Sequence, residues 1–167
     1  MDANELLDKV DKSRVFKEWR EEHKDSFLAH VFIMLEGEQI ADTQVGFFNP
    51  NANKMISFVV GDKEISMVPE ADVLQKPGSP SVKPLDESMI QFSFENAKVK
   101  AEEVLKEKYE TLASKKIFIL QKIEDDQLWN ITFLTNKFST VNIMIDSESG
   151  QVLKDEEVNL IDMNKSS

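Results

Sequence analysis

The sequence contains no cysteine, no signal peptide and no membrane-spanning segment. Without cysteine there are no disulfides, no thiolate metal ligands and no cysteine nucleophile. No apolar run reaches the roughly 20 residues that a membrane-spanning helix needs. Residues 1–9 lack the basic start and apolar stretch of a signal peptide. We therefore expect a cytoplasmic protein, while a trimmed form of an extracytoplasmic protein would show the same features.

Basic residues are also scarce. Lys and Arg number 20 against 31 Asp and Glu, which gives a net charge of −11 and a pI of about 4.7. The basic residues are scattered, whereas phosphate contacts need a concentrated basic face. An anionic membrane surface is disfavoured for the same reason. We expect no nucleic-acid partner and no membrane partner, and we interpret the acidity as a contribution to solubility.

The remaining composition is that of a globular protein, with 41% hydrophobic and 31% charged residues. A chain of 167 residues forms one ordinary domain or two very small ones. Eleven Phe against one Tyr and two Trp indicate that most aromatic side chains belong to a core.

Helical and strand patterns alternate along the chain. Amphipathic spacing predicts helices over residues 3–24 and 94–113, with Ser93 as a helix cap and Ser13 as a cap at a bend. Ile90 and Phe92 suggest a short strand before the second helix. Apolar or alternating runs bounded by turn residues predict further strands, over residues 27–35, 44–48, 55–60, 64–68 and 116–123, and in a hairpin within 128–153.

The two halves repeat the same spacing. Val31 to Met34 and Ile117 to Leu120 are similar and lie 86 positions apart. The same offset relates Val45 and Phe47 to Ile131 and Phe133, as well as Val15, Trp19 and His23 to Ala101, Leu105 and Tyr109. An offset of 85 relates Ile56, Phe58 and Val60 to Val141, Ile143 and Ile145. Each half is therefore predicted to be a helix followed by about four antiparallel strands.

This repeat predicts an α+β fold of two tandem units, each with one helix packed on a curled antiparallel sheet. The first unit covers residues 1–74 and the second covers 85–163. Residues 75–84 contain three of the five prolines and form the predicted linker, and 164–167 form a disordered tail. The alternative is that the two sheets join edge to edge into a longer one.

The second unit resembles the PepSY domain, over about residues 85 to 160. The similar residues are Ser93 to Ala97 at the helix start, Trp129 to Phe133, and Asn142 to Val152 with its Asp-to-Gly turn. The first unit departs from the motif, since Thr43 or Gln44 stands where the Trp is expected. The resemblance implies a cystatin-like fold and a binding, inhibitory or modulatory role toward a protein, often a peptidase. It implies no catalytic residues.

Candidate chemistry is sparse. His23 and His30 could each be a general base or a metal ligand, but His23 falls on the apolar helix face and His30 lies beside hydrophobic residues, so packed histidines are favoured. No Ser lies in a glycine-rich elbow, and no phosphate-binding loop is present. Gln44-Val45-Gly46 has the wrong spacing for the inhibitory loop of true cystatins.

Acidic turns offer the other candidates. Asp146 to Gly150 superficially resembles a calcium loop, but its Gly is fifth, where an EF-hand needs it sixth, and a hairpin turn explains the pattern. Glu124 to Asp126 and Asp155 to Glu157 could attract a weak cation, and solvated turns are the preferred interpretation. We therefore predict no catalytic residues, no cofactor and no metal.

Two functions remain in competition. The first is a non-catalytic module that binds a protein or peptide through a sheet edge or sheet face, and that could modulate a peptidase. The second is a small-ligand protein or an enzyme with a cavity between helix and sheet, lined by Phe47, Phe58 or Phe133. A monomer and a homodimer are both compatible with the sequence.

Overall fold

The computed structural model describes residues 2–72 and 81–160. The first half contains helices α1 (Ala3–Lys12) and α2 (Arg14–Glu22), then strands β1 (Phe27–Glu36), β2 (Gln39–Asn49), β3 (Lys54–Val60) and β4 (Ile65–Asp72). The second half contains a 3-10 turn (Glu87–Met89) and helix α3 (Phe94–Tyr109), then β5 (Ala113–Ile123), β6 (Asp126–Thr135), β7 (Ser139–Asp146) and β8 (Val152–Asn159).

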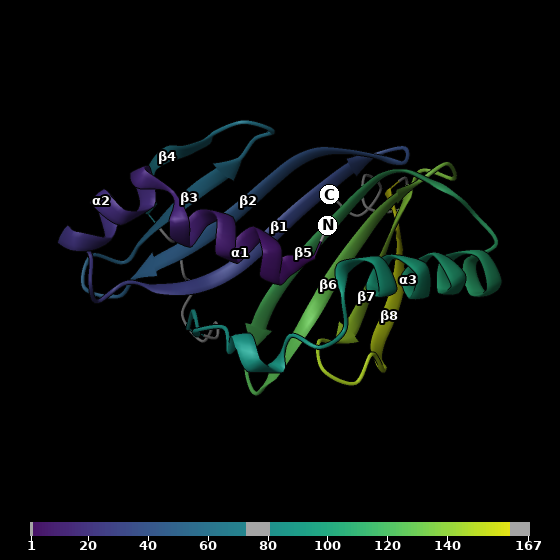
Figure 1. Ribbon diagram of the computed structural model, residues 1–167. Coiled ribbons are helices and arrows are strands. Elements are labelled where there is room, and N and C mark those ends of the chain that lie inside the picture. Colours follow the sequence, from purple (N-terminus) through teal and green to yellow (C-terminus); the bar gives the residue numbers. More distant parts are fainter. Residues whose placement is uncertain (1, 73–80, 161–167) are drawn as a thin grey trace.

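All eight strands belong to one antiparallel sheet, in the order β4-β3-β2-β1-β5-β6-β7-β8 (Figure 1). The predicted fold of two tandem helix-on-sheet units, each with its own four-stranded sheet, is therefore wrong. Strands β1 and β5 pair along their lengths, from His30 opposite Gln121 to Glu36 opposite Lys115. This pairing satisfies the backbone groups that two separate four-stranded sheets would leave unpaired at these edges.

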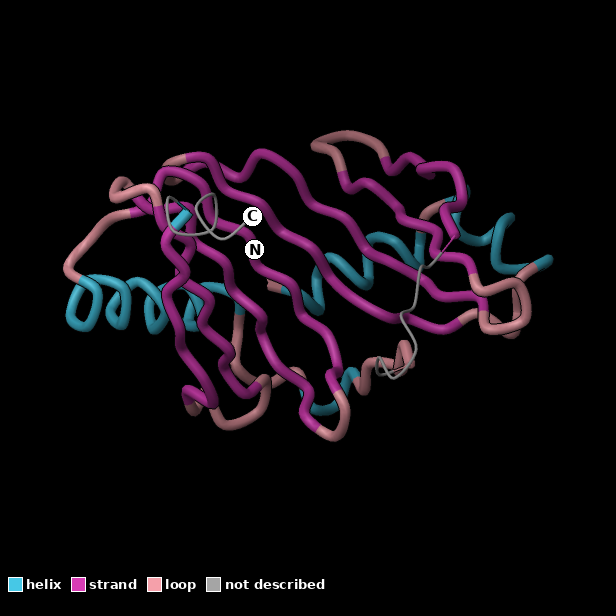
Figure 2. The backbone as a smooth tube through the Cα atoms, turned by 180° about the vertical axis from the view of Figure 1, so that it is seen from behind, coloured by secondary structure: helices cyan, strands magenta, loops and turns pink. Residues whose placement is uncertain are grey.

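The helices all lie on one face of the sheet. Helix α1 packs on β2 and β3, α2 on β4, and α3 on β7. Seen from behind, the sheet lies in front of all three helices (Figure 2). The protein is thus a two-layer α+β fold in which no helix of the described chain covers the second face of the sheet, called here the helix-free face.

The two halves are related by a local twofold arrangement at the β1–β5 seam. Phe32 opposes Ile119 there. Buried Val31 opposes Val45 in the first half, as buried Phe118 opposes Ile131 in the second. Val31 therefore corresponds to Phe118, at an offset of 87.

The predicted equivalence of Val31 with Ile117 is consequently wrong by one residue, because Ile117 points to the other face of the sheet from the buried side chains of β5. The offsets of 86 for β2 and β6 and of 85 for β3 and β7 are confirmed. The pairs Val45 with Phe58 and Ile131 with Ile143 occupy matching positions in the two halves.

Helix starts follow the predicted caps. The Ser13 hydroxyl accepts a hydrogen bond from the Phe16 N–H at 3.3 Å, and the chain bends at Ser13 between α1 and α2. The Ser93 hydroxyl accepts one from the Asn96 N–H at 3.1 Å. Each bond satisfies a backbone donor that the first turn of a helix leaves free.

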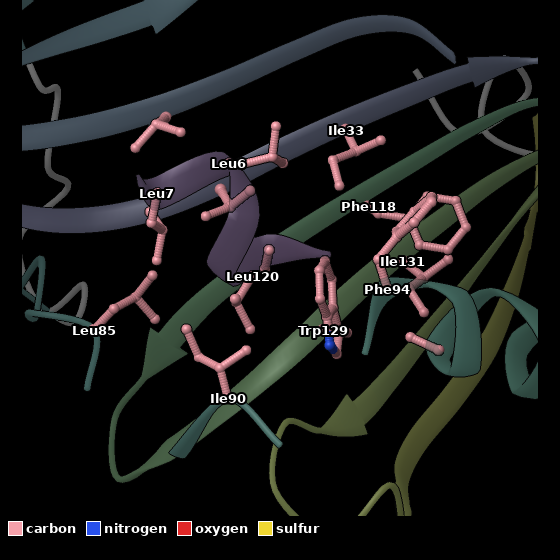
Figure 3. Close-up of a cluster of buried hydrophobic side chains, with 14 of the residues drawn as sticks. Leu6, Leu7, Ile33, Leu85, Ile90, Phe94, Phe118, Leu120, Trp129 and Ile131 are labelled. Carbon is pink, nitrogen blue, oxygen red and sulfur yellow. The ribbon is translucent and has the colours of Figure 1, made fainter. Parts of the chain in front are cut away.

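The hydrophobic core is continuous across the seam. Figure 3 shows side chains from α1 (Leu6, Leu7), β1 (Ile33), β5 (Phe118, Leu120) and β6 (Trp129, Ile131) that belong to this core. These side chains belong to one buried cluster, which also contains Phe58 of the first half and Phe133 of the second. Because the halves share a core as well as a sheet, neither half buries its apolar surface alone.

A few local expectations differ from the structure. Residues 90 and 92 form no strand, since the 3-10 turn precedes them and both Gln91 and Phe92 donate backbone hydrogen bonds to the Ser147 carbonyl. Helix α3 ends at Tyr109 because Glu110 adopts a left-handed conformation, with φ of 50°. Of the predicted linker, 75–80 lie outside the described residues, as does the predicted tail.

Candidate functional site

The helix-free face is defined by strand alternation. Side chains of the strands point alternately to the two faces, and the buried cluster beneath the helices contains every second residue of each central strand. The residues between them face the other way. From β3 to β7 these include Met55, Ser57, Val59, Asp42, Gln44, Gly46, Phe48, His30, Phe32, Met34, Ile117, Ile119, Gln121, Leu128, Asn130, Thr132, Thr140, Asn142 and Met144.

Asp42 is the one charged residue in this central part of the helix-free face as described, although 31% of the chain is charged. It opposes Met34 and accepts a hydrogen bond from the Gln44 carboxamide at 2.7 Å. The charged residues that share the face stand at its margins, such as Lys115 at one end of β5 and Glu156 on the edge strand β8. A sheet face that meets only water usually has polar and charged side chains. The central area instead combines apolar side chains with uncharged amides and hydroxyls.

Asn142 organises the polar part of the face. Its side-chain N–H group donates to the Asn130 carboxamide oxygen at 2.7 Å, to the Ile131 carbonyl at 3.1 Å and to the Thr132 hydroxyl at 3.3 Å. These bonds connect β6 and β7 side by side. They hold the Asn130 and Asn142 side chains in defined positions on this face.

His30 lies across the neighbouring strand. Its ring covers Gly46, where a Cβ atom would fall 2.1 to 2.6 Å from three ring atoms. Glycine in a strand interior weakens the strand and often marks a close approach of another group. Burial lowers the pKa of the His30 imidazole below its ordinary value, so the ring is neutral at pH 7.

A pocket of about 440 Å³ adjoins His30 on the same face. Strands β1, β3 and β5 contribute its floor, and residues 81–83 contribute a wall. The segment 81–85 is fixed here by the Leu85 N–H, which donates to the Leu28 carbonyl at 2.9 Å, and by Lys83 Nζ, which donates to the Glu124 carbonyl at 2.8 Å.

An ion-pair cluster joins the two halves on the helical side. The buried Lys116 ammonium lies 2.8 Å from Glu38 and 2.7 Å from Glu102, and Lys98 also binds Glu38. Burial opposes the charge of Lys116, but the two carboxylates raise its pKa. Hydrogen bonds from Lys116 and Lys98 lower the pKa of Glu38 to about 2. The side chains pair with one another, so the cluster is structural.

His23 serves as packing at the end of α2. Its ring stacks on Trp19 with 4.7 Å between ring centroids, and its Nδ1 lies 2.8 Å from the Trp19 carbonyl oxygen. His23 and His30 therefore occupy separate environments, and the structure does not bring them together.

The Asp146 turn closes on itself. The Asp146 carboxylate accepts hydrogen bonds from the backbone N–H groups of Ser149 and Glu148, and these bonds, Ser149 first, lower its pKa. Gly150 has a φ of 76°, as a tight turn requires. This geometry agrees with the preferred interpretation as a structural turn.

Asp155, in the acidic run from Asp155 to Glu157, is engaged by its neighbours. Asp155 binds Lys108 at 2.6 Å and accepts a hydrogen bond from the Tyr109 hydroxyl at 2.5 Å. These two contacts lower the pKa of Asp155, while burial and the Asp155 contact raise the pKa of Tyr109 to about 12. Within residues 2–72 and 81–160, no group of three or more His, Asp or Glu side chains is placed to hold a metal ion.

The aromatic side chains expected to line a cavity are packed in the core. Phe58 and Phe133 have no exposed surface, and Phe47 has 6%. Phe47 and Phe58 meet edge to face at 5.8 Å, as Phe118 and Phe133 do at 6.3 Å. The pocket beside His30 instead lies on the opposite side of the sheet.

The fold class is a two-layer α+β protein with a single eight-stranded antiparallel sheet. The described helices include none that is long and apolar enough to cross a membrane. No family model matches the sequence, and no curated protein matches it significantly. The chain is similar in structure to a predicted lipoprotein from Clostridium difficile 630, with a TM-score of 0.53 and 14% identity over 86% of this chain and 90% of that one. At this identity the likeness concerns the fold alone.

Proposed function

We propose that this chain is a non-catalytic module that binds a partner protein or peptide on its helix-free face. The main support is the scarcity of charged side chains at the centre of that face, where Asp42 alone is charged among the described residues, in a chain with net charge −11. The cores of protein–protein interfaces are depleted of charged residues in the same way. The partner surface is accordingly apolar at its centre, with uncharged polar groups that match the amides around Asn142.

Preorganisation adds to this support. The face spans strands from both halves, and the β1–β5 pairing and the shared core hold these strands together in one sheet. The amides near Asn142 are already fixed by hydrogen bonds. A rigid surface loses little conformational entropy on binding.

The resemblance of residues 85–160 to the PepSY domain suggests a peptidase as the partner, with this chain as its modulator. That assignment stays a prediction, as do the cytoplasmic location and the choice between monomer and homodimer. Docking on the sheet face does not depend on which compartment holds the protein.

Site-specific photo-cross-linking tests the proposal. A benzophenone amino acid replaces Met144, an apolar residue of the helix-free face, and a matched variant carries it at Val99 on the exposed side of α3. Illumination in the source cells is expected to give a discrete adduct from position 144 and none from position 99. Equal adducts from both positions, or none from position 144, would contradict docking on this face.

A further inference from the structure

The pocket beside His30 has the features of a site for a small molecule. Its volume of about 440 Å³ falls within the range of about 300 to 1,000 Å³ that is typical of ligand pockets. Phe32, Met55 and Ile119 from three strands line it together with Val82 and Ile123. These side chains provide an apolar surface for a flat or branched hydrocarbon body.

Two polar side chains in this lining have unused hydrogen-bonding capacity. His30 and Gln121 oppose each other across the β1–β5 seam. Neither the imidazole of His30 nor the carboxamide of Gln121 makes a side-chain hydrogen bond within the described part of the chain. Both side chains are half-buried, so a ligand in the pocket can reach their polar atoms and replace the water that meets them otherwise.

The sequence also fixes where the imidazole lies. Gly46 removes the side chain that would collide with the ring, which allows the ring to lie against β2. A neutral imidazole offers one N–H donor and one acceptor. Two lysines also line the pocket. The ammonium of Lys83 is bound to the Glu124 carbonyl at 2.8 Å, and the charge of Lys122 acts on the Asp86 carboxylate. The lining therefore favours an uncharged polar group over a carboxylate or phosphate.

We propose that this pocket binds a small uncharged molecule with an apolar body and one hydrogen-bonding head group, such as a ketone, amide or alcohol. The body lies against Phe32, Met55 and Ile119, and the head group meets His30 and Gln121. This site goes beyond the proposed function, since it requires no protein partner, although most of its strand residues belong to the same helix-free face. It also differs from the predicted cavity between helix and sheet, because it lies on the other face.

The test uses 6-propionyl-2-(dimethylamino)naphthalene, a neutral fluorescent probe with a naphthalene body and a ketone head group. The whole protein is expected to bind it saturably at one site, with a blue shift of the probe's emission. Ile119→Trp fills the pocket and is expected to weaken binding at least 10-fold. Val99→Trp adds the same side chain on the exposed side of α3 and is expected to leave binding unchanged.

The variant His30→Leu tests the contact with the head group separately from the apolar contacts of the body. It keeps an apolar lining but removes one hydrogen bond, which is expected to weaken probe binding about 5-fold. In the unmodified protein, NMR contacts between the probe and the His30 ring provide a readout that needs no variant. Absence of saturable binding, equal binding by Ile119→Trp, or probe contacts elsewhere would overturn the proposal. The Met144 cross-linking result does not depend on this outcome.

Discussion

His30 and Gly46 face each other in the β1–β2 ladder, and the imidazole of the first occupies the space of a side chain on the second. Gly46→Ala is expected to lower the free energy of unfolding by about 1 kcal/mol, because the new Cβ displaces the ring. In a His30→Ala background the same change is expected to be neutral or stabilising, since alanine loses less entropy than glycine in a strand. Urea denaturation of the four proteins measures this coupling. Equal effects of Gly46→Ala in both backgrounds would contradict it.

Gly150 and Gly37 form a matched pair of turn glycines. Both have positive φ, 76° and 62°, but a Cβ at Gly150 would meet the Phe92 ring at 2.4 Å, whereas nothing lies within 4 Å at Gly37. Gly37→Ala is expected to cost about 1 kcal/mol of stability from backbone strain alone. Gly150→Ala is expected to cost at least about 1 kcal/mol more, because Phe92 must move. Chemical denaturation that gives equal losses for the two variants would contradict this account of Gly150.

The shared core predicts a single unfolding transition. Each half contains one tryptophan, Trp19 in α2 and Trp129 in β6, and both are buried. In the single-tryptophan variants Trp129→Phe and Trp19→Phe, fluorescence reports on one half at a time. In each variant the fluorescence midpoint is expected to coincide with the midpoint from far-ultraviolet circular dichroism. Separate midpoints would mean that the halves unfold independently, despite the common sheet.

The Lys116 cluster predicts a specific acid dependence. The folded-state pKa of Glu38 is about 2, below its ordinary value of 4.5, so its contribution is present above pH 4.5 and is lost as the pH falls toward 2. Lys116→Met removes the main cause of this shift. At pH 7 its stability is expected to stay within about 1 kcal/mol of the parent, because an apolar group replaces a buried charge.

Between pH 4.5 and 2, Lys116→Met is expected to lose less stability than the parent protein. Lys12→Met is the control, because it breaks the exposed Lys12–Asp8 pair without touching the cluster. Urea denaturation across this pH range measures all three proteins. A pH dependence for Lys116→Met as steep as that of the parent would contradict the assignment.

Local elements were largely predictable from the sequence. The caps at Ser13 and Ser93 and the equivalence of Val45 with Ile131 follow from short-range patterns, and all three appear in the structure. The alignment of β1 with β5 was wrong by one residue. Residues 31–34 and 117–120 are apolar at every position, so they contain no alternation that sets which side chains face the helices.

The joining of the halves and the candidate surfaces were harder to predict. Pairing of β1 with β5 is a long-range contact that no local pattern encodes. The helix-free face did leave a signal, because Asn130, Thr132, Asn142 and Met144 alternate with core residues and none is charged. The sequence contains a weaker signal for the His30 pocket, namely Gly46 inside the predicted strand 44–48. Neither signal predicts a surface until the order of the strands is known, because that order decides which side chains lie next to one another.

The most direct test of docking on the helix-free face places a charge at its centre. Thr132→Lys introduces an ammonium beside the amides of this face, and Val99→Lys introduces the same group on the exposed side of α3. The measured quantity is the yield of the photo-adduct from benzophenone at position 144. It is expected to fall at least 10-fold with Thr132→Lys and to stay within twofold with Val99→Lys. An adduct yield that Thr132→Lys leaves unchanged, in a protein that remains folded, would contradict the proposed function.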